Sequence, residues 1–220
     1  MLVRRLGLGI AIVMVLSCAT VAPPVESLEF FKEAPADDPW HSKISEWQAR
    51  HRVDPALGPE VEGYGSELAE DYALFSRELK REIAAEAVRW TQSQSRRVYE
   101  PDGSQDHWAT LGEVLDEGSD DCDGLDLLTF QLLRRFGFEE REIVRSIVVQ
   151  NGSGQHHMVT LWFEAGEGDR DPYVLDPTGV VSSEMRRLSA IEGWVPIEAF
   201  DEDAHYRVES PSTPASVAGR

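Results

Sequence analysis

Cys122, His157 and Asp176 are the residues whose types and order could together perform nucleophilic chemistry. An apolar helical pattern from Asp121 to Phe136 puts Cys122 in the first turn of a helix, where unpaired N–H groups and the positive end of the helix dipole stabilise a thiolate. Such a nucleophile also needs an imidazole that exchanges protons and a third group that orients the imidazole. These residues therefore predict a Cys-His-Asp hydrolase, with the Cys122 N–H as the oxyanion donor.

His157 and Asp176 belong to two strand-like runs. The run from His157 to Glu164 alternates between two faces, and the run from Tyr173 to Asp176 resumes after a turn rich in Gly and Asp. If the two runs pair as an antiparallel hairpin, His157 and Asp176 fall near the same end and can hydrogen-bond. The same alternation points His156 to the opposite face, so at most one of the two histidines can serve.

Further helices and strands are expected around these segments. From Ser66 to about Gln94, apolar residues recur at three- and four-residue spacing, which predicts a long amphipathic helix. Its stripe is most simply explained as core packing, and it consists of Leu68, Tyr72, Phe75, Leu79, Ile83 and Ala87. A short helix is expected from Trp40 to Val53, and other strands are expected at Ile143 to Gln150, Trp194 to Ile197 and His205 to Val208.

Four segments resemble the transglutaminase-like cysteine peptidase superfamily, and its bacterial branch in particular. They are Trp108-Ala109-Thr110-Leu111-Gly112-Glu113, Asp121-Cys122-Asp123, His157-Met158-Val159 and Val174-Leu175-Asp176-Pro177-Thr178. The resemblance implies an α+β, papain-like or transglutaminase-like core, in which the nucleophile helix packs on an antiparallel sheet, with N-terminal helices beside it. In this arrangement Trp108 shapes the active-site cleft, helps to stabilise an oxyanion or is a buried structural residue.

The segment around Cys122 departs from the family pattern. Relatives commonly carry Gly-Asp-Cys-Glu-Asp, whereas residues 120–124 here read Asp-Asp-Cys-Asp-Gly. Residues 100–126 include ten acidic residues and no basic one, and such charge opposes a thiolate. Either the acids are solvent-directed caps, or Asp121 and Asp123 bind Ca²⁺, a hard cation that prefers oxygen ligands. The triad itself requires no cofactor, and zinc is disfavoured because soft ligands are few.

Charge and the first residues indicate where the protein acts. The formal net charge of -19, with 21 basic residues, argues against a nucleic-acid partner, because binding phosphates requires a concentrated positive surface. Arg4 and Arg5 precede an apolar run from Leu6 to Leu16, and the following Cys18 completes a pattern that resembles a bacterial lipoprotein signal. We therefore expect lipidation at Cys18 and a membrane anchor at the cell envelope. A simple secretory signal and an uncleaved anchor are the alternatives.

Five segments are expected along the chain: a lipoprotein signal peptide (1–18), a linker (19–39), an N-terminal helical region packed on the core (40–95), a transglutaminase-like domain (96–209) and a disordered tail (210–220). The leading hypothesis is a cell-envelope cysteine peptidase or amidase that hydrolyses amide bonds of protein or peptide substrates through Cys122, His157 and Asp176. Two alternatives stay open. One is transamidation, in which an amine resolves the acyl-enzyme, and the other is a catalytically inactive lipoprotein that serves as a binding or scaffold module.

Overall fold

The structure is a computed structural model that describes residues 35, 37–51, 65–101, 103, 107–165 and 171–209. The chain divides into two units, residues 1–54 and residues 55–220. The expected signal peptide, the lipidation site Cys18 and the expected tail lie outside the described residues, as does most of the expected linker. No helix within the described ranges is both long and apolar enough to cross a lipid bilayer.

The first unit contributes helix α1 (His41–His51), which confirms the helix expected between Trp40 and Val53. Asp38 precedes it, and the Oδ1 atom of Asp38 accepts a hydrogen bond from the Trp40 N–H at 2.7 Å. The large apolar side chains of this segment are exposed, and they are Trp40, Ile44 and Trp47. Packing of α1 on the core stays a prediction.

Helix α2 (Glu67–Val98) opens the described part of the second unit and extends past its expected end near Gln94. Ser66 caps it, because the Ser66 Oγ atom accepts the Ala69 N–H at 3.2 Å. The buried residues of α2 all lie in its C-terminal half and are Ala84, Ala87, Val88, Thr91, Gln92 and Ser95. This half of α2 is therefore the part of the helix that packs in the core.

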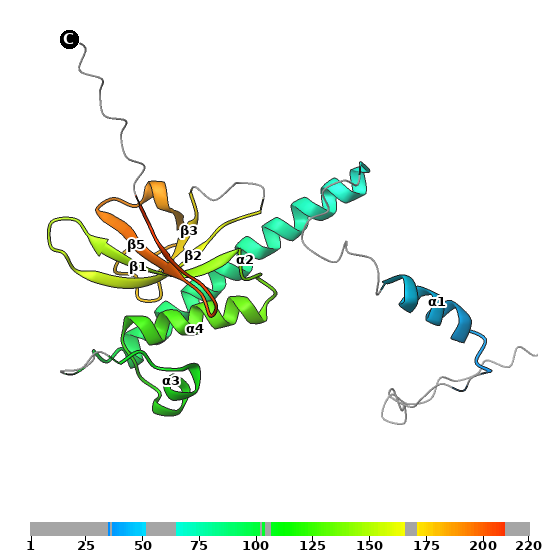
Figure 1. Cartoon of the computed structure of the whole chain (residues 1–220), viewed down its shortest axis with the longest axis horizontal. Coiled ribbons are helices and arrows are strands. Elements are labelled where there is room, and N and C mark those ends of the chain that lie inside the picture. The colour runs from blue at the N-terminus through cyan, green and yellow to red at the C-terminus, as the bar shows by residue number, and fades with distance from the viewer. Residues whose placement is uncertain are drawn as a thin grey trace, which may run out of the picture. The chain divides into compact units, whose positions relative to one another are not determined.

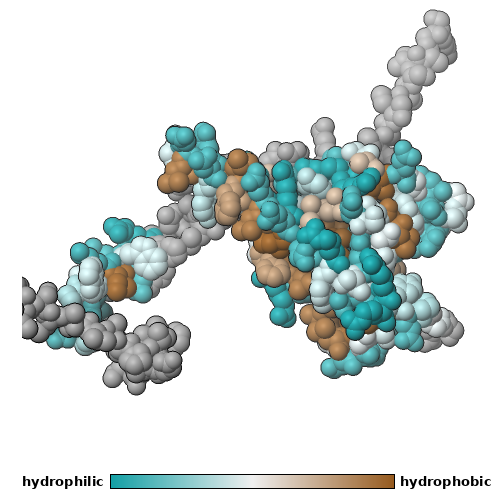
Figure 2. All heavy atoms as spheres, turned by 180° about the vertical axis from the view of Figure 1, so that it is seen from behind, coloured by the Kyte–Doolittle hydropathy of each residue, from teal (hydrophilic) through white to brown (hydrophobic). Residues whose placement is uncertain are grey.

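The expectation that the whole apolar stripe of α2 packs in the core is wrong. Its first four members, Leu68, Tyr72, Phe75 and Leu79, are exposed, and Figure 2 shows hydrophobic surface on this part of the helix. The reason is length: the 32 residues of α2 extend about 48 Å, whereas the 14 residues of its packing partner α4 (Cys122–Arg135) extend about 21 Å. A periodic stripe marks the face of a helix that can be buried, but the partner decides how much of that face is covered.

Helices α3 (Leu111–Glu117) and α4 lead the chain into the site. Helix α3 was not predicted, although Thr110 and Glu113 form a capping box that marks its start. Helix α4 was predicted, and Asp121 caps it by accepting the Asp123 N–H through Oδ1 at 3.1 Å. These caps place Cys122 at the first helical position of α4.

Six strands form one sheet in the order β4-β3-β2-β1-β5-β6, with every neighbouring pair antiparallel. Their bounds are β1 (Ile143–Gln150), β2 (His156–Trp162), β3 (Tyr173–Leu175), β4 (Arg186–Arg187), β5 (Trp194–Phe200) and β6 (His205–Arg207). The five expected strands and the β2–β3 hairpin are confirmed. The short strand β4 was not predicted, since two residues carry no detectable alternation.

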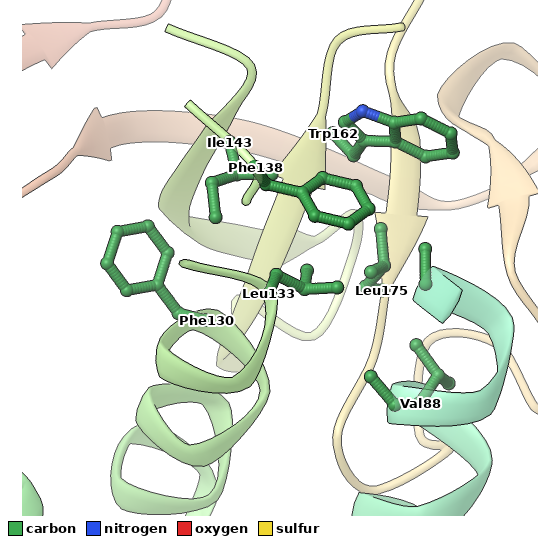
Figure 3. Packing of buried hydrophobic residues seen from close by; sticks show 9 residues of the cluster. Val88, Phe130, Leu133, Phe138, Ile143, Trp162 and Leu175 are labelled. Carbon is green, nitrogen blue, oxygen red and sulfur yellow. The ribbon is translucent and has the colours of Figure 1, made fainter. Parts of the chain in front are cut away.

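Alternation along the strands builds a core on each face of the sheet. On the helical face, Phe138 and Trp162 meet edge to face, and Figure 3 shows them packed with residues from α2 and α4. On the other face, the buried residues are chiefly valines, with Trp194 beside them. Figure 1 shows α2 and α4 against the sheet, which confirms the expected α+β class with the Cys122 helix packed on an antiparallel sheet.

Candidate active site

Cys122 is half-buried and lines a cavity of about 370 Å³, which we call the thiol cavity. As the first residue of α4, it has a backbone N–H without an intrahelical carbonyl partner. The cavity is completed by residues of α4, β1, β2 and the segment before α3, and its other lining residues are Trp108, Asp121, Asp123, Ile147, His156, His157 and Met158. The start of α4 therefore presents the thiol to the start of β2.

His157 and Asp176 come together as the hairpin geometry predicts. The Nε2 atom of His157 lies 2.9 Å from Oδ1 of Asp176, and both side chains are buried. The pairing of β2 with β3 brings the two residues to the same end of the ladder. Because Nε2 is engaged with the carboxylate, Nδ1 is the ring nitrogen left to exchange a proton with Cys122, which lines the same cavity.

The carboxylate of Asp176 is fixed by backbone N–H groups of the loop that follows it. Its Oδ1 accepts the Thr178 N–H at 2.9 Å, and its Oδ2 accepts the N–H groups of Val181 at 2.5 Å and Ser182 at 3.0 Å. Burial would raise the pKa of Asp176, but the hydrogen bond and charge of His157, together with these N–H donors, lower it. The carboxylate is therefore ionised at neutral pH and held in one orientation.

Two residues that hold the pair received no role from the sequence. The Thr178 hydroxyl donates to Oδ1 of Asp176 at 3.1 Å and lies 3.2 Å from Nε2 of His157. The Gln92 amide, on α2, donates to the carbonyl oxygens of Asp176 at 2.9 Å and Ser182 at 3.1 Å. Thr178 could have been found, since it closes the Asp-Pro-Thr run, whereas Gln92 is 84 residues from Asp176 and carries no local signal.

The electrostatics of the site favour a charged imidazole. Burial would lower the pKa of His157, but hydrogen bonds with Asp176 and Cys122 and the charges of both partners raise it to about 9. At neutral pH the ring is then an imidazolium between a carboxylate and a thiol. A cation in that position favours the anionic form of sulfur, which is the nucleophilic form.

A buried polar cluster fixes α4 against the sheet. The Arg145 guanidinium, on β1, donates to Oδ2 of Asp126 at 2.8 Å and to the carbonyl oxygen of Asp123 at 2.6 Å. The Thr160 hydroxyl, on β2, donates to Oδ1 of Asp126 at 2.7 Å. Since Asp126 lies one turn after Cys122, these bonds set the position of the thiol relative to β2, which carries His157.

Asp120, Asp121 and Asp123 form an acidic cluster beside the thiol, with one ligand oxygen of each within 4.8 Å of the others. Burial, a hydrogen bond with Asp121 and the charges of Asp121 and Asp120 raise the pKa of Asp123 to about 8, against the opposing charge of Arg145. Among the described residues, this is the one group of three or more candidate metal ligands that converge. Clustered carboxylate oxygens fit Ca²⁺, and a cation there would keep all three ionised.

Gly124 explains how the acidic residues are arranged. A Cβ atom added at residue 124 would overlap the carboxylate of Asp120, so the Asp120 side chain occupies the space that a side chain at position 124 would need. Compared with the Gly-Asp-Cys-Glu-Asp pattern, this chain has Asp in place of Gly at position 120 and Gly in place of Asp at position 124. The two differences fit each other, because the Asp120 side chain needs the space that Gly124 leaves free. The expectation that the acids are solvent-directed caps is confirmed for Asp121 as far as the cap goes, since Asp121 caps α4. It is wrong for Asp123, which is buried.

Two other expectations about the site have clear outcomes. His156 is exposed while His157 is buried, as the alternation of the strand predicts. Trp108 is 47% exposed and stacks on Phe200, with ring centroids 5.5 Å apart. It is therefore part of the wall of the thiol cavity, and the alternative of a buried structural tryptophan is wrong.

Comparison with models of known protein families gives no match, and comparison with curated protein sequences gives none. Among solved structures, the chain is similar to LapG of Legionella pneumophila. The EGTA-treated form has a TM-score of 0.49 and 17% sequence identity, over 70% of this chain and 84% of LapG. The calcium-bound form has a TM-score of 0.46 and 18% identity, over 70% of this chain and 90% of LapG.

Proposed function

We propose that this chain is a transglutaminase-like cysteine hydrolase that cleaves amide bonds of protein or peptide substrates through Cys122, His157 and Asp176. The observation that carries the proposal is the buried His157–Asp176 pair at 2.9 Å, opposite a thiol at the start of a helix. A nucleophile, a proton-transfer group and an orienting carboxylate are the parts that acyl transfer requires.

The roles follow from these positions. The Cys122 thiolate attacks the substrate carbonyl carbon, and the Cys122 N–H stabilises the oxyanion that forms. The His157 imidazolium gives its proton to the leaving amine as the C–N bond breaks, which leaves a thioester. The neutral imidazole then takes a proton from water, the hydroxide adds to the thioester, and the thiolate leaves to release the acid. Asp176 orients the ring throughout, and Thr178 and Gln92 position Asp176.

The acyl-enzyme could also be resolved by an amine, which would give transamidation in place of hydrolysis. Both reactions share every step up to the thioester, so the same triad serves each. Mass spectrometry of the products distinguishes them, because hydrolysis adds the mass of water to the peptide, whereas transamidation adds the amine and releases ammonia or the leaving peptide. Product mixtures formed with and without added lysine methyl ester would decide which reaction dominates.

Calcium binding belongs to the same proposal. Asp120, Asp121 and Asp123 would hold the ion, and their oxygens supply the hard ligands that Ca²⁺ prefers. Bound calcium would supply positive charge next to the nucleophile. The carboxylates of this cluster would then no longer oppose the thiolate that the chemistry needs.

Anchoring at the cell envelope through lipidated Cys18 completes the proposal. The mass of the mature N-terminal peptide is the direct test, since two or three acyl chains add a characteristic mass to a peptide that begins at Cys18. The Cys18→Ala variant should lose membrane association. A mature protein that begins elsewhere without acyl chains would contradict the anchor and leave the triad untouched.

Thiol reactivity tests the central claim. In a chain lacking residues 1–18, Cys122 is the remaining thiol, and its alkylation by iodoacetamide can be followed from pH 5 to 10. We expect rapid alkylation well below the pH of about 8.5 at which a free thiol ionises, and loss of that reactivity in His157→Ala. His156→Ala is the matched control, since His156 lines the same cavity but is exposed, and this variant should retain rapid alkylation at low pH.

Turnover then separates the enzyme from a binding module. Peptide cleavage should disappear in Cys122→Ser and should fall about 10³- to 10⁴-fold in Asp176→Asn, which leaves the ring unsupported. The triad would be refuted if Cys122 showed the alkylation profile of a free thiol, if that profile did not change in His157→Ala, and if no cleavage occurred. The lipoprotein would then be a scaffold or binding module.

A further inference from the structure

A second cavity, of about 500 Å³, opens beside the thiol cavity and shares two of its walls, Trp108 and Ile147. We call it the acidic cavity. Its aromatic floor is the Trp108–Phe200 pair, whose ring planes are 22° apart. A substrate that places a carbonyl group at Cys122 can therefore extend a neighbouring part of its chain over this floor.

The register of the sheet explains why these residues share one space. Ile147 pairs with Glu198 across β1 and β5, and Phe200 pairs with His205 across β5 and β6. Directly opposed residues of an antiparallel pair point to the same face. This face is the one that carries Arg145, which reaches Asp126 on α4, so the acidic cavity lies on the same side of the sheet as the nucleophile helix.

Four acidic residues line the acidic cavity beside this floor, and we call them its rim. They are Glu198, Asp201, Glu202 and Asp203, in β5 and the turn to β6. Asp201 serves the turn itself, since its Oδ1 accepts the N–H groups of Asp203 and Ala204. Glu198 pairs with His205 at 3.0 Å, and Glu202 accepts a hydrogen bond from the Gln131 amide at 3.2 Å.

Among the residues that the structure describes, the cations near the rim do not balance these acids. The Arg145 guanidinium lies 5.4 Å from the centroid of the Phe200 ring, but it is committed to Asp126. Arg207 lies opposite Glu198 in the β5–β6 register and is exposed. Within the described part of the chain, four carboxylates therefore face one exposed arginine and one histidine, and the cavity combines negative charge with an aromatic floor.

We propose that the acidic cavity is a substrate subsite that accepts a lysine or arginine side chain next to the bond attacked by Cys122, an inference that rests on the proposed hydrolase function. The aliphatic stem of such a side chain would lie on Trp108 and Phe200, and its charged head would reach Glu202 and Asp203. The carboxylates of the rim would repel an acidic side chain. An aliphatic side chain would pack on the aromatic floor but would have no charge to pair with the rim.

Cleavage of a peptide mixture tests this assignment. Decapeptides with randomised positions would be digested by the full chain, and the new ends would be sequenced by mass spectrometry. We expect lysine and arginine to be preferred at one fixed position relative to the cleaved bond. The preference should fall about three- to tenfold in the double variant E202Q/D203N, which removes two exposed charges and keeps the Asp201 turn.

The matched control is D71N/E78Q, which removes the same charge from exposed positions on the projecting half of α2. It distinguishes a local subsite from general attraction of basic peptides to an acidic protein. The preference should survive in this control and should weaken for wild type as salt rises. An equal loss of preference in both double variants would overturn the subsite.

A binding measurement keeps the subsite separable from catalysis. In the Cys122→Ala variant, the NMR signal of the Trp108 indole N–H, assigned through Trp108→Phe, should shift on addition of acetyl-Gly-Arg-Gly-amide. The shift should be much smaller with the same peptide carrying norleucine in place of arginine. Cys122-dependent cleavage without a basic preference would overturn the subsite and leave the hydrolase. Binding of the arginine peptide without any cleavage would support the subsite and overturn the hydrolase function. The absence of both binding and cleavage would overturn both proposals.

Discussion

Replacing Asp126 by alanine tests whether the buried cluster holds α4 on the sheet. Asp126 is fully buried, and its two oxygens accept hydrogen bonds from Arg145 at 2.8 Å and Thr160 at 2.7 Å. The substitution leaves the guanidinium of Arg145 buried, with 11% of its side chain exposed, and without its carboxylate. Breaking a buried ion pair in this way costs about 3 to 5 kcal/mol of unfolding free energy.

Denaturant unfolding followed by tryptophan fluorescence measures this cost, because the chain has six tryptophans. The double variant D126L/R145M removes both charges and should recover most of the loss, since well-packed apolar residues commonly replace a buried ion pair without net destabilisation. Asp116→Ala, at an exposed position on α3, is the control and should change stability by no more than about 0.5 kcal/mol.

Two results would refute this reasoning. One is a loss below about 1 kcal/mol in Asp126→Ala with an unchanged denaturant slope, which would mean that water or another residue reaches Arg145. The other is a double variant no more stable than the single one. The penalty would then come from a packing defect at residue 126 and not from an unpaired charge.

Three further predictions concern the acids of the site. In the presence of a calcium chelator, the unfolding free energy should fall as pH rises from about 4 to about 8, because native Asp123, with a pKa raised to about 8, keeps a proton that the unfolded chain has lost. Asp123→Asn should remove this pH dependence when stability is measured by denaturant titration. The same pH dependence in the variant would contradict the assignment to Asp123. Asp176→Asn should lower the pKa of His157 from about 9 towards 6.5 in an NMR titration of the ring. The stabilisation from protonated His157, present below about pH 6.5 and lost as pH rises through about 9, should shrink with it. Gly124→Ala should displace Asp120 and weaken calcium binding about tenfold by calorimetry, and unchanged affinity would exclude Asp120 as a ligand.

Local sequence was sufficient for the parts of the site that depend on periodicity. The strand alternation placed His157 on the buried side and His156 on the exposed side, and the hairpin brought His157 to Asp176. Period and capping are properties of a few consecutive residues, so they can be read before the chain folds. For the same reason, the helix that begins at Cys122 was expected.

Contacts between distant segments were decided only by the tertiary structure. The support of Asp176 by Gln92 joins α2 to the loop after β3, and the anchoring of α4 by Arg145 joins it to β1. Polar residues inside helical and strand patterns have many potential partners, and only packing of the layers selects one of them. No spacing in the sequence marks such a choice.

The apolar stripe of α2 shows the same division between sequence and fold. Its period was determined by the sequence, but whether Leu68 or Ala87 is buried depends on where α4 and the sheet end. The acidic run around Cys122 follows this rule too, since the clash between Asp120 and a side chain at position 124 exists only in the folded turn. The sequence alone determined which residues could do chemistry and on which elements they lie. The tertiary structure decided what holds them, because burial and hydrogen-bond partners arise only when separate elements meet.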